Sequence, residues 1–401
     1  MKKHVLMIVE NNPVPHDIRV WNEAQALVEL GYQVTIISPR SEKSPAKFEI
    51  LNGIALYRHY IPFEGGGKFG LLFEYLNARF WEFFLSIRIY INNPFDVIHA
   101  ANPPDHIFLI AALYKSLDVR FIFDHHDITP ENYLAKFNRA DILYEISLYM
   151  EKMTFRTADI VISTNESYKT IALTRGHKND DDVFVVRNGP NLRNIPPVTA
   201  NDKWKDGFKY MIAYVGNIGN QEGIDSLLKI VHYLVYKRGI MDTRFIVVGT
   251  GPHWQAMVQL AKMMNLEKYV LFTGYIPYKD FYEILATADL CINPEFRNEF
   301  TDRSTMIKIM DYMTFGKALV QFETTEGKVT AGDAAYNVRD NNIEHFADAI
   351  VYLIENPRTR QKMGEIGRMR IEKSLNWDEQ KKVLKSAYTY LEQKSKIVPS
   401  S

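Results

Sequence analysis

The sequence predicts an α/β protein with two doubly wound, Rossmann-like parallel-sheet domains. Short apolar runs alternate with segments of helical period through most of the chain. The runs are continuous, as in parallel strands that are buried on both faces. The pattern also restarts near the middle of the 401 residues, and one core rarely extends beyond about 250–300 residues.

The first half predicts one parallel sheet. A strand over Val5–Val9 leads to a helix over Ile18–Leu30 and a second strand over Val34–Ser38. Later apolar runs of the same kind predict strands at Val97–Ala100, Phe121–Asp124, Ile160–Ser163 and Val183–Val186. Helical stretches between several of these runs favour parallel pairing.

A linker is expected after Asn188-Gly189-Pro190, because the chain up to about Lys209 contains Pro196 and Pro197 and little periodicity. Strands are then expected at Tyr210–Val215, Phe245–Val248, Val270–Phe272, Leu290–Asn293 and Ala318–Gln321. Helices are expected from the Gly216–Gly223 loop to about Tyr236, at Asp280–Ala288 and at Thr305–Thr314.

These boundaries predict an N-terminal domain over residues 1–195 and a C-terminal domain over residues 205–375. Residues 376–401 are expected to form a helix that packs back on the N-terminal domain. A flexible tail is expected from Lys394 to Ser401.

Composition excludes several classes of protein. Lys+Arg and Asp+Glu both number 48, so no overall basic charge indicates nucleic-acid binding. The single cysteine, Cys291, excludes an intramolecular disulfide framework and a thiolate zinc cluster. The apolar run Val5–Val9 is too short for a signal peptide, and no later run approaches the ~20 residues of a membrane span. A cytoplasmic location is therefore expected, at the inner face of the cell membrane.

The loops that follow the strands resemble one enzyme family. Asp17-Ile18-Arg19-Val20 with Glu23 is similar to the opening helix of the retaining glycosyltransferases of family 4. Further segments occur in that family's order and spacing: Asp124-His125-His126-Asp127, Asn188-Gly189-Pro190, Val215-Gly216, Val248-Gly249-Thr250-Gly251-Pro252, Phe272-Thr273-Gly274-Tyr275 and Met310–Lys317. The resemblance covers about residues 4–390 and looks closest to the branch that assembles bacterial surface polysaccharides. It implies a GT-B fold, in which the two domains face each other across a cleft. It also implies a nucleotide-sugar donor and no metal or other cofactor.

The donor side is assigned to the C-terminal domain. The N-terminus of the helix that ends at Thr314 offers backbone N–H groups and a partial positive charge, which suit a phosphate. By resemblance, Asp311 accepts hydrogen bonds from the ribose hydroxyls. The candidate donor-binding residues are Gly216, Asn217, Gly219, Gly251, Arg303, Ser304, Thr305, Met306, Lys308 and Asp311. Alternatively, Asp302 or Ser304 only caps the helix.

The sequence departs from the family pattern at two places. The family's first glutamate is replaced by Arg303, so that Asp302, Glu299 or Glu295 is left to supply a carboxylate. The family's loop arginine and lysine are replaced by Asn217 and Glu222. Neutralisation of the phosphates is therefore expected to shift toward the helix that follows Arg303.

His126 and Asp127 are the candidate catalytic residues of the N-terminal domain. By resemblance, His126 reaches the donor sugar. A structural histidine and a metal ligand are the alternatives, but a zinc site needs three or four ligands and none can be assigned. The resemblance also implies retention by front-face attack, in which the protein positions the groups and stabilises charge.

The acceptor side is assigned to Asp17, Arg19, Asn102 and Trp81. Trp81 belongs to an apolar helical stretch, Lys68–Asn92, that follows a predicted hinge at Gly65-Gly66-Gly67. One side of this helix is expected to meet a membrane surface or a lipid-linked acceptor; burial between neighbouring elements is the alternative.

Two other functions remain open. A UDP-sugar 2-epimerase shares this architecture but needs acid and base groups for proton abstraction, and no clear set is present. A catalytically silent partner subunit would explain the replacements at Arg303, Asn217 and Glu222.

Overall fold

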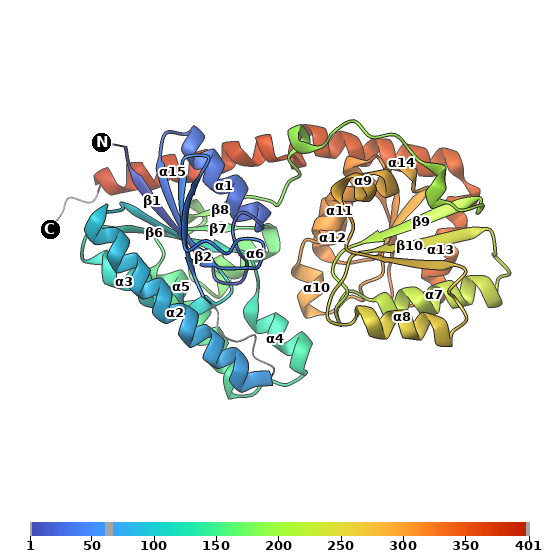
Figure 1. Cartoon of the computed structure of the whole chain (residues 1–401), viewed down its shortest axis with the longest axis horizontal. Helices are drawn as coiled ribbons and strands as arrows, with labels where there is room; N and C mark the ends of the chain where they lie inside the picture. The colour runs from blue at the N-terminus through green and yellow to red at the C-terminus, as the bar shows by residue number, and fades with distance from the viewer. Residues whose placement is uncertain (1, 61–66, 398–401) are drawn as a thin grey trace. The chain divides into compact units, whose positions relative to one another are not determined.

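The computed structural model describes residues 2–60 and 67–397. The chain divides into two compact units, Met1–Asn188 together with Gln380–Ser401, and Gly189–Glu379 (Figure 1). Gly65 and Gly66 of the predicted hinge, and residues 398–401 of the predicted tail, lie outside the described residues.

The first unit is built on an eight-stranded sheet with the order β3-β4-β2-β1-β5-β6-β7-β8. All pairs are parallel except β3 with β4. The strands are β1 (His4–Ile8), β2 (Gln33–Pro39), β3 (Phe48–Leu51), β4 (Ile54–His59), β5 (Val97–Ala101), β6 (Arg120–His125), β7 (Ile160–Ser163) and β8 (Val183–Val185).

The helices of this unit are α1 (Ile18–Glu29), α2 (Gly67–Asn92), α3 (Phe108–Lys115), α4 (Thr129–Phe137), α5 (Ile142–Thr157) and α6 (Glu166–Thr174). The last helix of the chain, α15 (Trp377–Ile397), joins them from Gln380 onward. Two hydrogen bonds hold α15 against the first unit. Lys381 of α15 donates to Glu29 of α1 at 2.8 Å, and Tyr32, in the turn after α1, donates to Glu392 of α15 at 2.7 Å.

The second unit is built on a six-stranded parallel sheet with the order β11-β10-β9-β12-β13-β14. Its strands are β9 (Tyr210–Val215), β10 (Thr243–Val248), β11 (Val270–Gly274), β12 (Leu290–Asn293), β13 (Leu319–Phe322) and β14 (Ala335–Val338). Its helices are α7 (Ile224–Tyr236), α8 (Trp254–Met263), α9 (Tyr278–Thr287), α10 (Glu299–Arg303), α11 (Ile307–Thr314), α12 (Thr325–Ala331), α13 (Ile343–Glu355) and α14 (Pro357–Arg370).

Both faces of the second sheet are covered by helices, which explains its continuous apolar strands. On β9, Ile212 and Tyr214 pack into the core under α7, α8 and α13, whereas Met211, Ala213 and Val215 pack under α9 and α11. Figure 1 shows these two groups of helices on opposite sides of the sheet. Because the strand has a period of two, full burial on both faces removes any polar alternation.

Every strand predicted from the sequence is present within about two residues of its expected ends. Three strands, β3, β4 and β14, were not predicted. The helix expected at Thr305–Thr314 begins at Ile307, and a separate short helix, α10, precedes it. The expected tail is helical as far as Ile397. None of the helices in residues 2–60 and 67–397 is long and apolar enough to cross a membrane.

Candidate active site

The turn after β6 presents His126 at the carboxyl end of the first sheet. The side chain of Asn102, which follows β5, accepts hydrogen bonds from the backbone N–H groups of His126 and Asp127 at 2.6 and 3.1 Å. Its amide donates to Asp105 at 2.7 Å and to the Asp127 carbonyl at 2.6 Å. Asn102 is fully buried, and its side-chain oxygen and nitrogen both form hydrogen bonds within the protein. It therefore stabilises this turn and has no side-chain atom available to contact an acceptor substrate.

Asp127 is also tied into the turn. Its carboxylate accepts from the Ile128 N–H at 2.8 Å and from the Asn132 amide at 3.1 Å. Burial raises the pKa of Asp127, and these hydrogen bonds lower it only in part. Asp127 therefore stabilises the turn that carries His126 and precedes α4, which begins at Thr129 without a side-chain cap.

Arg19 is the centre of a buried cluster in the first unit. Its Nη1 donates to the Val186 carbonyl and to Asn188 at 2.8 and 2.7 Å. Its Nη2 pairs with Asp124 at 2.8 Å and lies 3.1 Å from Glu23, while Nε lies 2.6 Å from Nε2 of His126. Arg19 therefore joins α1, the end of β6 and the chain beyond β8.

Asp17, the other charged residue predicted on α1, is its N-cap: the carboxylate accepts from the Val20 N–H at 3.0 Å. This contact satisfies one of the donors that a helix leaves unpaired in its first turn. Asp17 thus fixes where α1 begins and so where Arg19 lies.

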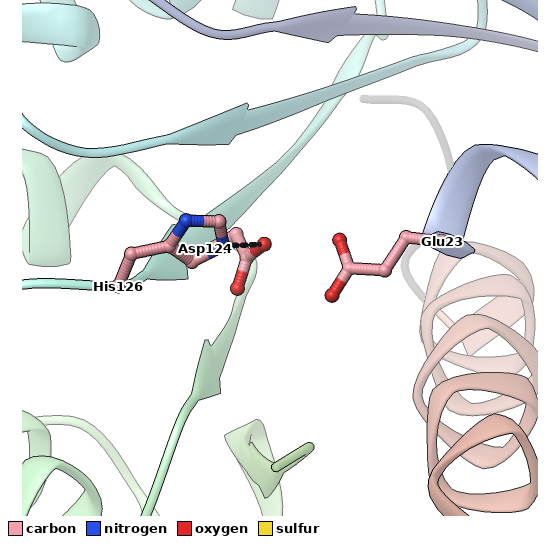
Figure 2. Close-up of side chains that lie close together, drawn as sticks. All are labelled: Glu23, Asp124 and His126. Atoms are coloured by element: carbon pink, nitrogen blue, oxygen red, sulfur yellow. Dashed lines mark hydrogen bonds and ion pairs between the residues drawn. The ribbon is translucent and has the colours of Figure 1, made fainter. Parts of the chain in front are cut away.

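Glu23, Asp124 and His126 form the one group of three potential metal ligands found among the described residues, with ligand atoms within 4.8 Å of one another. Figure 2 shows Asp124 and His126 in contact and the Glu23 carboxylate pointing toward Asp124 from α1. The Arg19 guanidinium already contacts all three side chains. A cation bound there would be repelled by Arg19, so these residues do not fit a metal site.

The two carboxylates of this cluster differ in charge. Burial alone would raise the pKa of Asp124, but Arg19 and His126 hold it well below its usual value. Burial raises the pKa of Glu23 well above its usual value, because Arg19 offsets it only in part and Asp124 adds repulsion. The surroundings of the cluster therefore favour the ionised form of Asp124 and the protonated form of Glu23.

In the second unit, the loops after β9 and β10 pack directly on each other. Gly249 has a φ of +127°, and a Cβ there would collide with the Gly216 carbonyl. A Cβ on Gly251 would lie 2.5 Å from Asn217 and 2.6 Å from the Ile218 carbonyl. Only glycine fits at these two positions, and loop packing is sufficient to explain Gly249 and Gly251.

The Gly216–Gly223 loop supplies no cation of its own. Glu222 folds back and accepts from the Gly219 N–H at 3.0 Å and from the Asn217 amide at 3.3 Å. The residues that replace the family's loop arginine and lysine therefore bond to each other.

Lys308, in the first turn of α11, lies beside this loop. Its Cε lies 3.0 Å from where a Gly216 Cβ would be, and its Nζ lies 4.9 Å from the centre of the Tyr214 ring. Its ammonium forms an ion pair with Glu295, which follows β12. Burial alone would lower the pKa of Lys308, but Glu295 and Tyr214 raise it above its usual value. Lys308 thus stays positively charged at the carboxyl end of β9.

The other residues predicted before α11 are arranged differently. Arg303 ends α10 and pairs with Glu299 at 2.9 Å on the surface. Ser304 is buried in extended backbone at the end of α10, and Thr305 lies 3.5 Å from Glu326. Met306 directly precedes α11, and no side chain caps that helix.

Of the three acids that could replace the family's first glutamate, Glu295 alone pairs with α11. Asp302 accepts from the backbone N–H and hydroxyl of Thr325 at 2.9 and 3.0 Å, and Glu299 is exposed beside Arg303. Glu295 is buried, and its second oxygen has no hydrogen-bond partner. The sequence alone left all three acids possible, because it does not show the path of the chain between β12 and α11.

Asp311 lies one turn after Lys308 on α11. Burial raises the pKa of its carboxyl group from about 3.8 to about 7, and no hydrogen bond from a described residue offsets this effect. Asp311 is half-buried, and a carboxyl group with a raised pKa and no hydrogen bond from a described residue marks a candidate functional site.

Sequence reasoning did not identify Tyr312, which sets the position of α11. The Tyr312 hydroxyl donates to the Ile292 carbonyl at 3.0 Å and accepts from the Val215 N–H at 3.1 Å. Its side chain is fully buried. It ties α11 to the ends of β9 and β12 and so brings Lys308 to Gly216.

From Asn77 onward, helix α2 exposes several large apolar side chains. Phe80, Phe84 and Ile91 are exposed, and Trp81 is 38% exposed, whereas Glu82 and Ser86 are buried. The buried side holds an Arg79–Glu82 ion pair of 2.6 Å and a Tyr114–Ser86 hydrogen bond of 3.0 Å. In the described part of α2, these apolar side chains are therefore not covered within the first unit.

Two family models match the chain. The model of glycosyltransferase family 4 matches residues 18–194, and the model of group 1 glycosyl transferases matches residues 209–356. Together they span most of both units.

The chain is 22% identical over 294 residues to the phosphatidylinositol N-acetylglucosaminyltransferase GPI3 subunit of Saccharomyces cerevisiae. That match covers 71% of this chain and 60% of the relative.

The solved structures show the same fold over nearly the whole chain. Sucrose-phosphate synthase from Thermosynechococcus elongatus has a TM-score of 0.78 at 16% identity, and the match covers 98% of this chain and 100% of that one. HepE from Anabaena, in complex with UDP, has a TM-score of 0.72 at 13% identity over 96% and 99%. A glycosyltransferase family model matches each of the two units, and the fold is shared with solved glycosyltransferase structures. The chain therefore belongs to the family 4 glycosyltransferases of the GT-B fold.

Proposed function

We propose that the chain transfers a sugar from a UDP-sugar to a glycan or lipid-linked acceptor, with retention of configuration. One observation carries this proposal: α11 places the Lys308 ammonium beside Gly216 and the unbonded Asp311 carboxyl one turn further on. A cation suits a diphosphate, and a carboxylate that only accepts suits ribose hydroxyls.

The residues divide between the two tasks of the reaction. Lys308 and the N-terminus of α11 stabilise the charge that develops on the leaving diphosphate. By resemblance to the family, His126 is the residue that contacts the donor sugar. Retention then follows from front-face attack of the acceptor hydroxyl as the diphosphate departs, without a metal and without an enzyme nucleophile. The protein contributes positioning and charge stabilisation.

Uridine is favoured as the base by the relatives. The HepE structures hold UDP and UDP-glucose, and the yeast relative is named as an N-acetylglucosaminyltransferase. The transferred sugar is accordingly proposed to be a hexose or an N-acetylhexosamine.

A lipid-linked acceptor is supported by α2. Its exposed Phe80, Phe84 and Ile91, together with Trp81, are suited to contact with a membrane surface. The yeast relative is named for phosphatidylinositol as its acceptor. We place the enzyme at the cytoplasmic face of the cell membrane, in surface polysaccharide synthesis.

Incubation of the whole chain with each candidate donor, without acceptor, tests the proposal. Slow release of UDP from a UDP-sugar is expected, because water replaces the missing acceptor. Release of an isomerised sugar would instead indicate an epimerase.

A catalytically silent subunit is a second candidate function, and the composition of the Gly216–Gly223 loop favours it. Where relatives in the family place cations, this loop has Asn217 and Glu222 bonded to each other. Lack of binding to every nucleotide sugar would support this candidate and contradict the transferase.

A further inference from the structure

Tyr214, near the carboxyl end of β9, contacts both α11 and the Gly216–Gly223 loop. Its ring centre lies 4.9 Å from Nζ of Lys308, and its hydroxyl donates to the Asn217 carbonyl at 3.1 Å. A Cβ at Gly216 would lie 3.0 Å from the Tyr214 hydroxyl oxygen and 3.0 Å from Cε of Lys308. A single side chain therefore contacts the loop and the cation that together form the proposed phosphate site.

The contact between Tyr214 and Lys308 joins two separate elements. Five other lysine–aromatic contacts in the described part of the chain join residues no more than four positions apart, as Lys209 and Tyr210 do. Tyr214 is fully buried, and the Lys308 side chain is 10% exposed. A ring face attracts a cation more strongly where the pair is shielded from water. The ring of Tyr214 therefore helps to determine where α11 places its ammonium group.

The two neighbours of the Lys308 ammonium affect its charge differently. The ion pair with Glu295 offsets the positive charge. Burial raises the pKa of the Tyr214 hydroxyl to about 12, so the ring is uncharged at neutral pH and attracts the ammonium without offsetting its charge. An ammonium has three N–H donors, and no described residue other than Glu295 and Tyr214 pairs with this one. One N–H is therefore left for a ligand.

We propose that Tyr214 is a positioning residue whose ring face holds the Lys308 ammonium beside Gly216, ready to bind the diphosphate of the donor. Burial and the hydrogen bond to Asn217 fix the ring, so the ring restricts a lysine side chain that would otherwise be flexible. Without this restriction, phosphate binding has to order the side chain, which weakens the affinity. The inference rests on the proposed function, in which Lys308 binds the diphosphate.

Fluorination of the ring tests the proposal at nearly constant side-chain size. The whole chain is prepared with Tyr214→Phe and with the mono-, di- and trifluorinated forms of that phenylalanine. Fluorine withdraws electron density from the ring face, so each added fluorine weakens the attraction for a cation. We expect the affinity for UDP to fall with each fluorine, by roughly 10-fold over the series, and the affinity for uridine, which has no phosphate, to stay the same. A role in packing alone would give equal UDP affinities across the series.

The same strand offers a matched control. Tyr210 is also on β9, and its ring centre lies 4.9 Å from Nζ of Lys209, so the same series at Tyr210 should leave UDP affinity unchanged. A second control repeats the Tyr214 series in the Lys308→Met/Glu295→Gln background, where the ring has no cation to attract. Urea unfolding without nucleotide should show stability that falls with fluorination when Lys308 is present and stays constant in that background.

The inference is overturned if UDP affinity does not depend on fluorination at Tyr214 while Lys308→Met weakens UDP binding; the proposed function then stands. If Lys308→Met leaves UDP affinity unchanged, the proposed contact of Lys308 with the diphosphate fails, and the inference fails with it. If Tyr214→Phe does not fold, fluorinated tyrosines at the same position retain the hydroxyl and replace the series.

Discussion

At the scale of the residue, burial decides the charge of Asp311 before any ligand binds. Its pKa of about 7 means that the folded protein holds a proton there which the unfolded chain releases near pH 4. The carboxyl therefore changes charge within the pH range of ordinary assays, and a ribose hydroxyl is a better donor to the ionised form.

Nucleotide binding should strengthen as the pH rises through about 7, because binding favours the ionised Asp311. Asp311→Ala should weaken UDP affinity roughly 10- to 100-fold at pH 8, as expected for a lost hydrogen bond to a charged group. Calorimetric titration at pH 6 and pH 8 measures both effects. Asp225→Asn, which removes a surface carboxylate on α7 paired with Lys229, is the control. Unchanged UDP affinity in Asp311→Ala would refute the ribose contact.

The same group should lower stability as the pH rises. Because the folded pKa is raised, the folded state binds the extra proton between about pH 4 and pH 7, and the free energy of unfolding falls across that window. Asp311→Asn should remove this fall, which between pH 5 and pH 8 is up to about 3 kcal/mol at about 1.4 kcal/mol per pKa unit. Urea unfolding of both proteins at pH 5 and pH 8 tests this; parallel curves would contradict it.

His126→Ala should slow turnover and leave nucleotide affinity unchanged. The proposed contact of His126 is with the sugar, whereas Lys308 and Asp311 are the residues proposed to contact the nucleotide. A loss of roughly 100-fold in kcat is expected for a group that stabilises the transition state. Steady-state kinetics with the donor varied, together with UDP titration, separates the two quantities. A weaker UDP affinity at unchanged kcat would contradict the assignment.

At the scale of the element, α11 is held in place by buried polar contacts. Tyr312 joins it to β9 and β12, and Lys308 joins it to the loop after β12 through Glu295. These contacts lie in a low-dielectric interior, where an unpaired charge is costly. The positions of Lys308 and Asp311, the proposed donor-binding residues, therefore depend on Tyr312 and Glu295.

Lys308→Met should cost about 3–5 kcal/mol of stability, because it leaves the Glu295 carboxylate buried without its partner. The double variant Lys308→Met/Glu295→Gln should recover most of that loss yet still fail to bind UDP. Urea unfolding and UDP titration on the single and double variants test this. Recovery of binding in the double variant would show that Lys308 has no direct contact with the phosphates.

At the scale of the whole molecule, ligand binding should be seen as added stability. A ligand that binds only the folded state raises the unfolding temperature by an amount that depends on its concentration and affinity. UDP and UDP-sugars should raise Tm, whereas GDP and ADP at equal concentration should raise it less. A larger shift with GDP would move the donor proposal to a GDP-sugar.

Much of the fold followed from the sequence, because continuous apolar strands and helical periods are local patterns. The hairpin β3–β4 was not predicted, although Asn52-Gly53 between two apolar runs is a strong hairpin signal. The start of α11 was misplaced because Arg303, Ser304 and Thr305 are compatible with either a helix or a turn.

The sequence by itself determined the two α/β units and their family, and it singled out His126, Lys308 and Asp311. Only the tertiary structure showed that Glu295 pairs with Lys308 and that the side chain of Asn102 stabilises the turn after β6. It also showed that the Arg19 guanidinium lies among Glu23, Asp124 and His126, where a metal ion would have to bind. The physical reason is the distance along the chain over which each property is determined. Strand and helix patterns depend on residues that are neighbours in the sequence. Charge, proton position and hydrogen-bond satisfaction are set by buried groups such as Arg19 and Asp124, which lie far apart along the chain.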